Sequence, residues 1–173
     1  MTLLISTRRL QMSDRAAFEH ATSLWDYSNT GFLWSKPAEG QSYEDFVQRL
    51  QDQEKGVNLP EGWVPCTAIY AFVGQDLVGR VNVRHQLNDF LLNVGGHIGY
   101  GVVPPYRGQG IATHLLGVGL EEARRLGIAR ALVTCNEDND ASARVIEKQG
   151  GVFENHFDPG GGVPLKRRYW IEL

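Results

Sequence analysis

The sequence has few cysteines and no long apolar run. Among its 173 residues, only Cys66 and Cys135 are cysteines, and they are far apart and in no CxxC arrangement. This spacing excludes a disulfide scaffold and a cysteine-rich zinc site, and it suits a reducing compartment. No stretch approaches the ~20 apolar residues that a membrane helix requires. The first apolar residues soon meet Arg8-Arg9, which is not the pattern of a signal peptide. We therefore expect a cytoplasmic protein with no membrane partner.

The sequence also has no excess of basic residues. It carries 17 basic and 20 acidic residues, a formal charge of −3. A nucleic-acid binder normally shows a clustered basic excess, whereas the basic cluster Lys166-Arg167-Arg168 is explained as a solvated strand or turn. Three histidines, His20, His85 and His114, have no metal-ligand spacing. The sequence therefore predicts neither a nucleic-acid partner nor a metal site.

The length and the apolar patterns predict one α/β domain over residues 1–173. A chain of this length fits a single hydrophobic core. Strands are expected at 3–10, 66–73, 77–86, 95–103, 130–135, 153–157 and 165–171, and helices at 14–25, from 43 onward after Ser42, 108–126 and 139–149. The order βααβββαβαββ indicates a mixed, mostly antiparallel central sheet flanked by helices. Gly117 and Gly119 lie inside the long helix, where close helix-to-sheet packing is their simplest explanation.

A glycine-rich turn carries the strongest chemical signal. The strand predicted to end at Val103 is stopped by Pro104-Pro105, and Arg107-Gly108-Gln109-Gly110 then opens a helix. The first amides of a helix have no intrahelical partner and lie at the positive end of its dipole. Glycine lets this backbone approach an anion without a Cβ in the way. The turn therefore predicts a phosphate or diphosphate site, with added positive charge from Arg107.

Two common phosphate-binding motifs do not fit this turn. A Walker P-loop needs Gly-Lys-Ser/Thr, and the sequence has no such run. A dinucleotide-binding turn needs GxGxxG and an acid about twenty residues later. Here Thr113 stands at the third glycine, and residues 126–130 hold no acid. A nucleotide-dependent oxidoreductase consequently has thin support.

The segment Val102-x-Pro104-x-x-Arg107-Gly108-x-Gly110-Ile111-Ala112 resembles the acetyl-CoA-binding motif of the GNAT N-acetyltransferase superfamily, whose core reads Arg/Gln-x-x-Gly-x-Gly/Ala. The expected order of elements matches that family nearly end to end. A helix start whose glycines only permit tight packing is the alternative.

The resemblance implies an acetyltransferase that takes acetyl-CoA as co-substrate. The pantetheine arm would follow the strand edge at Val102 and Val103, and the Val102 amide would bind the thioester carbonyl. The diphosphate would lie on the amides of Gly108, Gln109, Gly110, Ile111, Ala112 and Thr113, beside Arg107.

A second block supports the resemblance. Asn139-x-x-Ser142-x-x-Val145-Ile146-Glu147-Lys148-x-Gly150 is similar to the family segment that borders the pantetheine arm. Asn139 and Ser142 are therefore candidate cofactor contacts. The same residues also suit a helix cap and a solvated serine, and both interpretations stay open.

The resemblance also implies direct attack of an amine on the thioester. Family members often place a glutamate base five residues before the position of Val102, and here that residue is His97. A half-buried sheet histidine is its alternative interpretation. Tyr100 is the second catalytic candidate. The family tyrosine that protonates the departing thiolate is replaced by Ile146, which has no proton to donate, and Cys135 is interpreted as an inert strand cysteine.

The acceptor is open at this stage. Aromatic residues in the two N-terminal loops form either an acceptor wall or a core cluster: Trp25, Tyr27, Phe32, Trp34 and Trp63. A small amine or amino acid, an antibiotic and a protein N-terminus all fit, and the acidic balance favours a cationic or neutral acceptor. The alternative from another class is a non-catalytic acyl-CoA-binding or sensing module, which the missing tyrosine favours. An exposed edge strand near the C-terminus would permit a homodimer.

Overall fold

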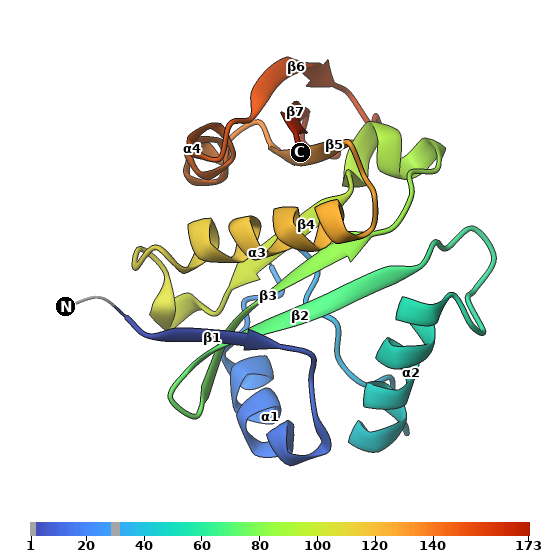
Figure 1. Cartoon of the computed structure of the whole chain (residues 1–173), viewed down its shortest axis with the longest axis vertical. Helices are drawn as coiled ribbons and strands as arrows, with labels where there is room; N and C mark the ends of the chain where they lie inside the picture. Colours follow the sequence, from blue (N-terminus) through green and yellow to red (C-terminus); the bar gives the residue numbers. More distant parts are fainter. Residues whose placement is uncertain (1–2, 29–31) are drawn as a thin grey trace.

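Seven strands form a single mixed sheet in the computed structural model, which describes residues 3–28 and 32–173 (Figure 1). The strands lie in the order β1-β2-β3-β4-β5-β7-β6, and every neighbouring pair is antiparallel except β4 and β5. The strands are β1 (Ile5–Arg8), β2 (Cys66–Val73), β3 (Asp76–Arg84), β4 (Ile98–Val102), β5 (Arg130–Asn136), β6 (Val152–Phe157) and β7 (Lys166–Glu172). The helices are α1 (Arg15–Leu24), α2 (Tyr43–Lys55), α3 (Ile111–Arg125) and α4 (Asp140–Lys148). The predicted element order and fold class are confirmed.

The two faces of the sheet carry different helices. Because side chains alternate along a strand, neighbouring residues of β2 enter different cores. Ile69 and Ala71 pack with α3 and α4, whereas Ala68 and Tyr70 pack with α1 and α2. Figure 1 shows α1 and α2 in the lower part of the molecule, with β6, β7 and α4 at the opposite end. An opening between two strands of this sheet would therefore connect the side covered by α3 and α4 with the side covered by α1 and α2.

Local sequence signals explain where α2 begins and how α3 packs. The Ser42 side chain accepts a hydrogen bond from the Asp45 amide at 3.0 Å, the N-cap that the sequence predicted. A Cβ added at Gly119 would lie 2.9 Å from Val81 Cγ2, so α3 approaches β3 closely there. At Gly117 a Cβ would meet only the Gln149 side chain, at 3.5 Å. Close packing therefore explains Gly119 and not Gly117.

Two boundaries differ from the sequence prediction. Helix α1 begins at Arg15 and not at residue 14, because Asp14 ends a 3₁₀ turn in which Arg8 and the Gln11 amide bind its carboxylate. A π-helical turn at Leu91–Gly95 precedes β4, which begins at Ile98 and not at residue 95. Gly96 allows this turn: its φ is 66°, and a Cβ there would lie 2.6 Å from the Leu132 carbonyl oxygen.

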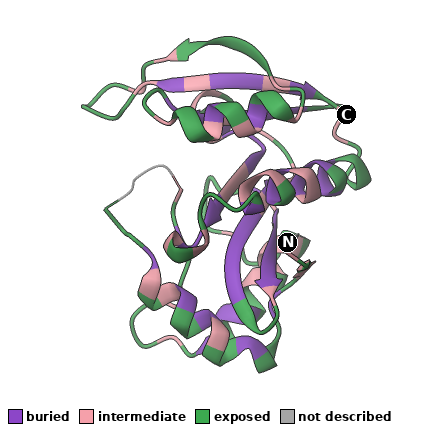
Figure 2. Ribbon diagram, turned by 90° about the vertical axis from the view of Figure 1, so that its left-hand side faces the viewer, coloured by how far each residue is buried: buried purple, intermediate pink, exposed green. Residues whose placement is uncertain are grey.

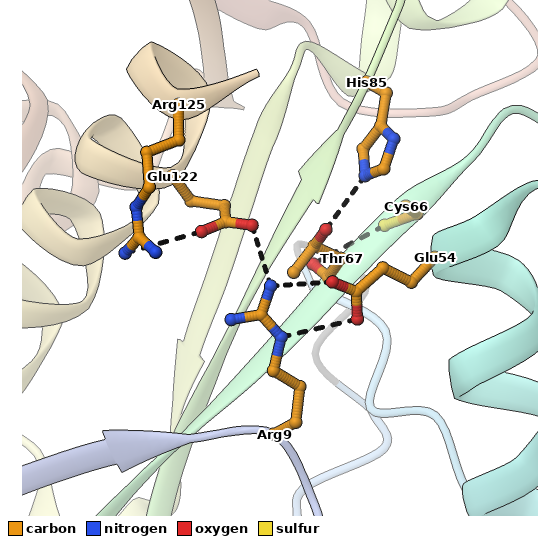
Figure 3. A network of polar contacts seen from close by, with 7 residues as sticks. All are labelled: Arg9, Glu54, Cys66, Thr67, His85, Glu122 and Arg125. Atoms are coloured by element: carbon orange, nitrogen blue, oxygen red, sulfur yellow. Dashed lines mark hydrogen bonds and ion pairs between the residues drawn. The ribbon is translucent and has the colours of Figure 1, made fainter.

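Arg9 links two helices at one end of the sheet (Figure 3). Its Nη2 donates to Glu54 on α2 at 2.7 Å and to Glu122 on α3 at 2.8 Å. Glu122 is buried, and Arg125 lies 3.6 Å from its second oxygen. This ion-pair network holds together elements that lie on opposite faces of the sheet.

The outer strand β6 is exposed along most of its length, including Val152 and Phe153, and it lies at the top of Figure 2. It is the edge strand on which the prediction of a homodimer rests, and that prediction stays untested. Within residues 3–28 and 32–173, no helix combines the length and apolarity needed to cross a membrane.

Candidate active site

A cavity of about 940 Å³ opens where β4 and β5 separate. The two parallel strands pair at Ile98 and Val133. Beyond this pair, residues of both strands line the cavity, among them Tyr100 and Val102 on β4 and Cys135 on β5. The cleft therefore passes between the strands and joins the α3/α4 face of the sheet to the α1/α2 face.

The glycine-rich turn presents free amides to this cleft. Gly108 and Gly110 have φ values of 77° and 83°, so the left-handed backbone of the turn requires glycine. The first backbone bond of α3 runs from the His114 amide to the Gly110 carbonyl. In the described part of the chain, the amides from Gly108 to Thr113 thus have no backbone acceptor. Except for Gln109, the residues of this stretch line the cleft.

Arg107 fixes the turn against the end of β4. Its Nε donates to the Val102 carbonyl at 3.1 Å, and its guanidinium carbon lies 5.9 Å from the centre of the Trp25 ring. The side chain is exposed and lines the cleft. It consequently places positive charge at the rim, as the sequence predicted, and also holds the turn in position.

The free edge of β4 is at Val102 and not at Val103. The Val103 amide donates to the Val78 carbonyl of β3 at 2.9 Å. Since successive amides point to opposite edges of a strand, the Val102 amide points toward β5 and the cleft. Val103 is fully buried and does not line the cleft. The geometry therefore argues against the predicted contact at Val103, because its amide is already used within the sheet.

Tyr100 of β4 meets helix α4 at another part of the cleft wall. The Asn139 side chain accepts from the Ser142 amide at 3.0 Å, so Asn139 caps α4 while also lining the cleft. The Tyr100 hydroxyl lies 2.7 Å from Ser142 Oγ. Burial raises the pKa of Tyr100, which keeps the phenol protonated at neutral pH. Ile146 is fully buried in the core.

His97 does not face the cleft. The residue is 7% exposed, and its Nδ1 accepts a hydrogen bond from the Leu132 amide at 2.9 Å. Burial lowers the pKa of His97, and the nearby Arg84 charge lowers it further. The lone pair that a base would use is occupied by this bond. The geometry therefore argues against the predicted catalytic role and favours the structural interpretation of His97.

Cys135 lines the cleft as a buried thiol. Burial raises its pKa to about 11, so the thiolate is scarce at neutral pH. This environment agrees with the interpretation of Cys135 as an unreactive strand residue.

The aromatic cluster divides into a wall and a core. Trp25, Phe32 and Trp63 line the cleft, whereas Trp34 is buried and stacks on Trp25 at a ring distance of 4.8 Å. A Cβ at Gly101 would lie 2.5 Å from the Phe32 ring. The absence of a side chain at this position thus makes room for the aromatic wall beside β4.

Two arginines of β3 line the cleft and were missed from the sequence. Arg80 and Arg84 alternate with Val81 and Val83 and so lie on the α1/α2 face. The sequence did offer a signal for them: two arginines stand on the same face of a strand that is otherwise largely apolar. None of the described residues that line the cleft is an Asp, Glu or His. In the described ranges there is also no cluster of three or more potential metal-ligating His, Cys, Asp or Glu side chains.

Comparison with known proteins identifies a family and its fold. Residues 6–152 match the family model described as acetyltransferase (GNAT) domain, and no curated protein matches the sequence. The ribosomal-protein-S5-alanine acetyltransferase from Vibrio fischeri aligns with a TM-score of 0.72 at 16% identity, covering 97% of this chain and 92% of that chain.

Two further solved structures contain the coenzyme. RimL, a ribosomal L7/L12 alpha-N-protein acetyltransferase in complex with coenzyme A, aligns with a TM-score of 0.69 at 19% identity, covering 100% of this chain and 96% of that chain. The protein yncA from Salmonella typhimurium, with its cofactor acetyl-CoA, aligns at 0.66 and 15% identity, covering 98% and 94%. At these identities the likeness shows a shared fold.

Proposed function

This chain belongs to the GNAT acetyltransferase family and depends on acetyl-CoA, and we propose that it acetylates a primary amine of a small molecule or peptide by direct attack on the thioester. The observation that carries the proposal is the row of amides from Gly108 to Thr113, which have no backbone acceptor among the described residues and lie at the mouth of a cleft between two separating strands. We assign the whole chain, residues 1–173, to one catalytic domain. Both cysteines are unpaired, which supports the cytoplasm as its location.

The proposed cofactor contacts follow the wall of the cleft. The diphosphate binds the amides of the turn, with Arg107 adding positive charge. The pantetheine arm runs along the free edge of β4, where the Val102 amide donates to the thioester carbonyl and stabilises the oxyanion. Asn139 and Ser142 border the arm from α4.

The proposed reaction needs two proton transfers. The neutral amine attacks the carbonyl carbon, the carbon–sulfur bond breaks and the thiolate leaves. Tyr100 gives its proton to the thiolate and regains one from solvent through Ser142, whose hydroxyl is 2.7 Å away. In this proposal Tyr100 protonates the departing thiolate, which the side chain of Ile146 cannot do.

The lining of the cleft supports a reaction without a protein base. Its described titratable residues include Arg80, Arg84, Arg107 and Lys166, and no carboxylate or histidine. Nearby positive charge lowers the pKa of an ammonium group and thus favours the reactive neutral amine. The second proton then passes from the product to water.

A pair of glycine variants tests the cofactor site. Gly108→Ala puts a side chain on a left-handed residue of the turn, and Gly162→Ala does the same at the same φ of 77° at a position that does not line the cleft. We expect Gly108→Ala to weaken coenzyme A binding in calorimetry by roughly ten-fold or more, and Gly162→Ala to leave it unchanged. Equal affinities in the two variants would contradict the assignment of this turn.

Activity is tested separately by thiol release over a panel of amines. Release that requires an amine supports acetyl transfer. Coenzyme A binding without release on any amine would instead favour a sensing module.

A further inference from the structure

The part of the cleft on the α1/α2 face is positively charged. Arg80 and Arg84 enter it from β3, and no described lining residue is acidic. The sequence positions between the described ranges, Asn29-Thr30-Gly31, contain no acid either. Neither arginine forms an ion pair in the described part of the chain. Such a space disfavours a cationic acceptor, contrary to the expectation from net charge.

Arg84 presents an unused hydrogen-bonding edge. Its Nη1 donates to the carbonyls of Gly95 and Gly96, at 2.9 and 3.2 Å, which fixes the guanidinium in place. Among the described residues, no acceptor binds its Nε or Nη2. This edge of a guanidinium matches the two oxygens of a carboxylate. Burial lowers the pKa of Arg84, and the charge of Arg80 lowers it further, so an anion would relieve an unfavourable environment.

Arg80 is the second, deeper cation. It is 1% exposed, with its guanidinium carbon 4.9 Å from the Phe32 ring centre. Its Nη2 donates to the Leu33 carbonyl at 2.7 Å, while Nε and Nη1 have no partner in the described ranges. Leaving buried donors of a charged group unused is costly. The buried Tyr70 hydroxyl, which also has no hydrogen-bond partner among the described residues, interacts with this guanidinium, so Arg80 contributes a buried positive charge beside the cleft.

The two arginines lie beside different residues of the neighbouring strand β4. Arg80 pairs across the strands with Gly101, next to Val102, and a Cβ at Gly99 would lie 3.6 Å from Arg84 Nη1. Gly99 lies three residues before Val102, and three residues of a strand span roughly 10 Å. A hydrogen bond of about 3 Å at Arg84, a short amino acid, and an approach of roughly 3–3.5 Å between its amine and the thioester carbon together cover this length.

From this arrangement we propose that the acceptor is a small amino acid, whose carboxylate binds Arg84, with the Arg80 charge behind it, while its amine lies at Val102. The inference rests on the proposed acetyl transfer and names its substrate class. Phe32 and Trp25 form the wall against which the carbon skeleton packs.

The test compares the common amino acids with their carboxamides, with thiol release as the measurement. The two forms of each acceptor differ in one negative charge, and the carboxamide has the less basic and thus more available amine. We expect the carboxylate form to have the higher kcat/KM, by roughly ten-fold to a hundred-fold, as a charged hydrogen bond provides.

Variants of Arg84 then test whether this residue causes the preference for the carboxylate form. Arg84→Gln is expected to bring the ratio of the two kcat/KM values close to one, Arg84→Lys to leave an intermediate ratio, and the exposed Arg144→Gln to leave it unchanged. Because a ratio does not depend on the active fraction of the enzyme, partial unfolding of an Arg84 variant does not obscure the result.

Three outcomes would overturn the proposal: a wild-type ratio of one or less, an unchanged ratio in Arg84→Gln, or a preference for C-terminally amidated peptides over every amino acid. Failure to acetylate any amine despite coenzyme A binding is a different result. It would contradict the proposed function itself.

Discussion

At the scale of single residues, Tyr100 connects β4 to α4. Its hydroxyl bonds Ser142, and burial keeps it protonated. Tyr100→Phe removes only the proton donor, so we expect kcat to fall roughly ten-fold to a hundred-fold, with little change in acetyl-CoA affinity. The loss of activity is limited because a thiolate whose thiol has a pKa of roughly 8–9 also leaves without protonation. Steady-state kinetics measure the effect, and the exposed Tyr27→Phe is the control. An unaltered kcat would remove Tyr100 from the mechanism.

His97 makes a pH-dependent contribution to stability. Its pKa is lowered by burial, so the unfolded chain binds a proton more readily than the folded chain. The free energy of unfolding therefore falls as the pH drops below the unfolded value of about 6.5. His97→Asn keeps an acceptor for the Leu132 amide without titrating, and we expect its unfolding free energy to depend less on pH between 7.5 and 5.5 (roughly one unit either side of the ordinary pKa).

Chemical denaturation at each pH measures this slope, with the exposed His114→Asn as control. The same variant tests the mechanism. We expect His97→Asn to leave the pH profile of kcat unchanged near neutrality, whereas a base at His97 would require that profile to change.

The sequence predicts the geometry of the glycine-rich turn better than that of the proposed catalytic residues. Gly108 and Gly110 are recognisable because a left-handed backbone at a helix start needs glycine. The geometry argues against a base at His97 because the Leu132 amide occupies its lone pair, which strand position alone does not reveal. Arg80 and Arg84 were missed because only the assembled sheet shows that they lack acidic partners among the described residues.

At the scale of elements, α3 approaches the sheet at one glycine and not at another. Gly119→Ala would force a Cβ to within 2.9 Å of Val81, and we expect it to destabilise the fold by about 1–3 kcal/mol. Gly117→Ala has room and removes backbone freedom, so a gain of about 0.5–1 kcal/mol is expected. Urea unfolding of the two variants measures the difference. Equal effects would show that α3 does not pack as described.

The order of elements was predictable because each strand and helix has its own apolar period and its own stop. The limits of β2 follow from the nearly continuous apolar run between Pro65 and Gly74, and those of α2 from Ser42 and Gly56. The π-helical turn at Leu91–Gly95 was not predictable, since it depends on contact between Gly96 and β5. Local sequence patterns thus predict the helices and strands, whereas irregular segments such as this turn depend on contacts between elements.

At the scale of the whole molecule, Arg9 joins both helical layers (Figure 3). Arg9→Met would leave the buried Glu122 carboxylate without its nearest cation. We expect a loss of about 1–3 kcal/mol in unfolding free energy. Thermal unfolding measures it, beside Arg15→Met, which breaks the exposed pair with Glu19 and should have little effect. If both variants unfold alike, the Arg9 network does not couple the layers.

The central claim is that free amides at the start of α3 hold the diphosphate of the coenzyme. Amide NMR spectra of this 19.3 kDa chain test it directly, with coenzyme A and with pantetheine, which lacks the diphosphate. We predict that the amide signals from Gly108 to Thr113 shift with coenzyme A and stay in place with pantetheine. Coenzyme A binding that leaves those signals unmoved would contradict the account.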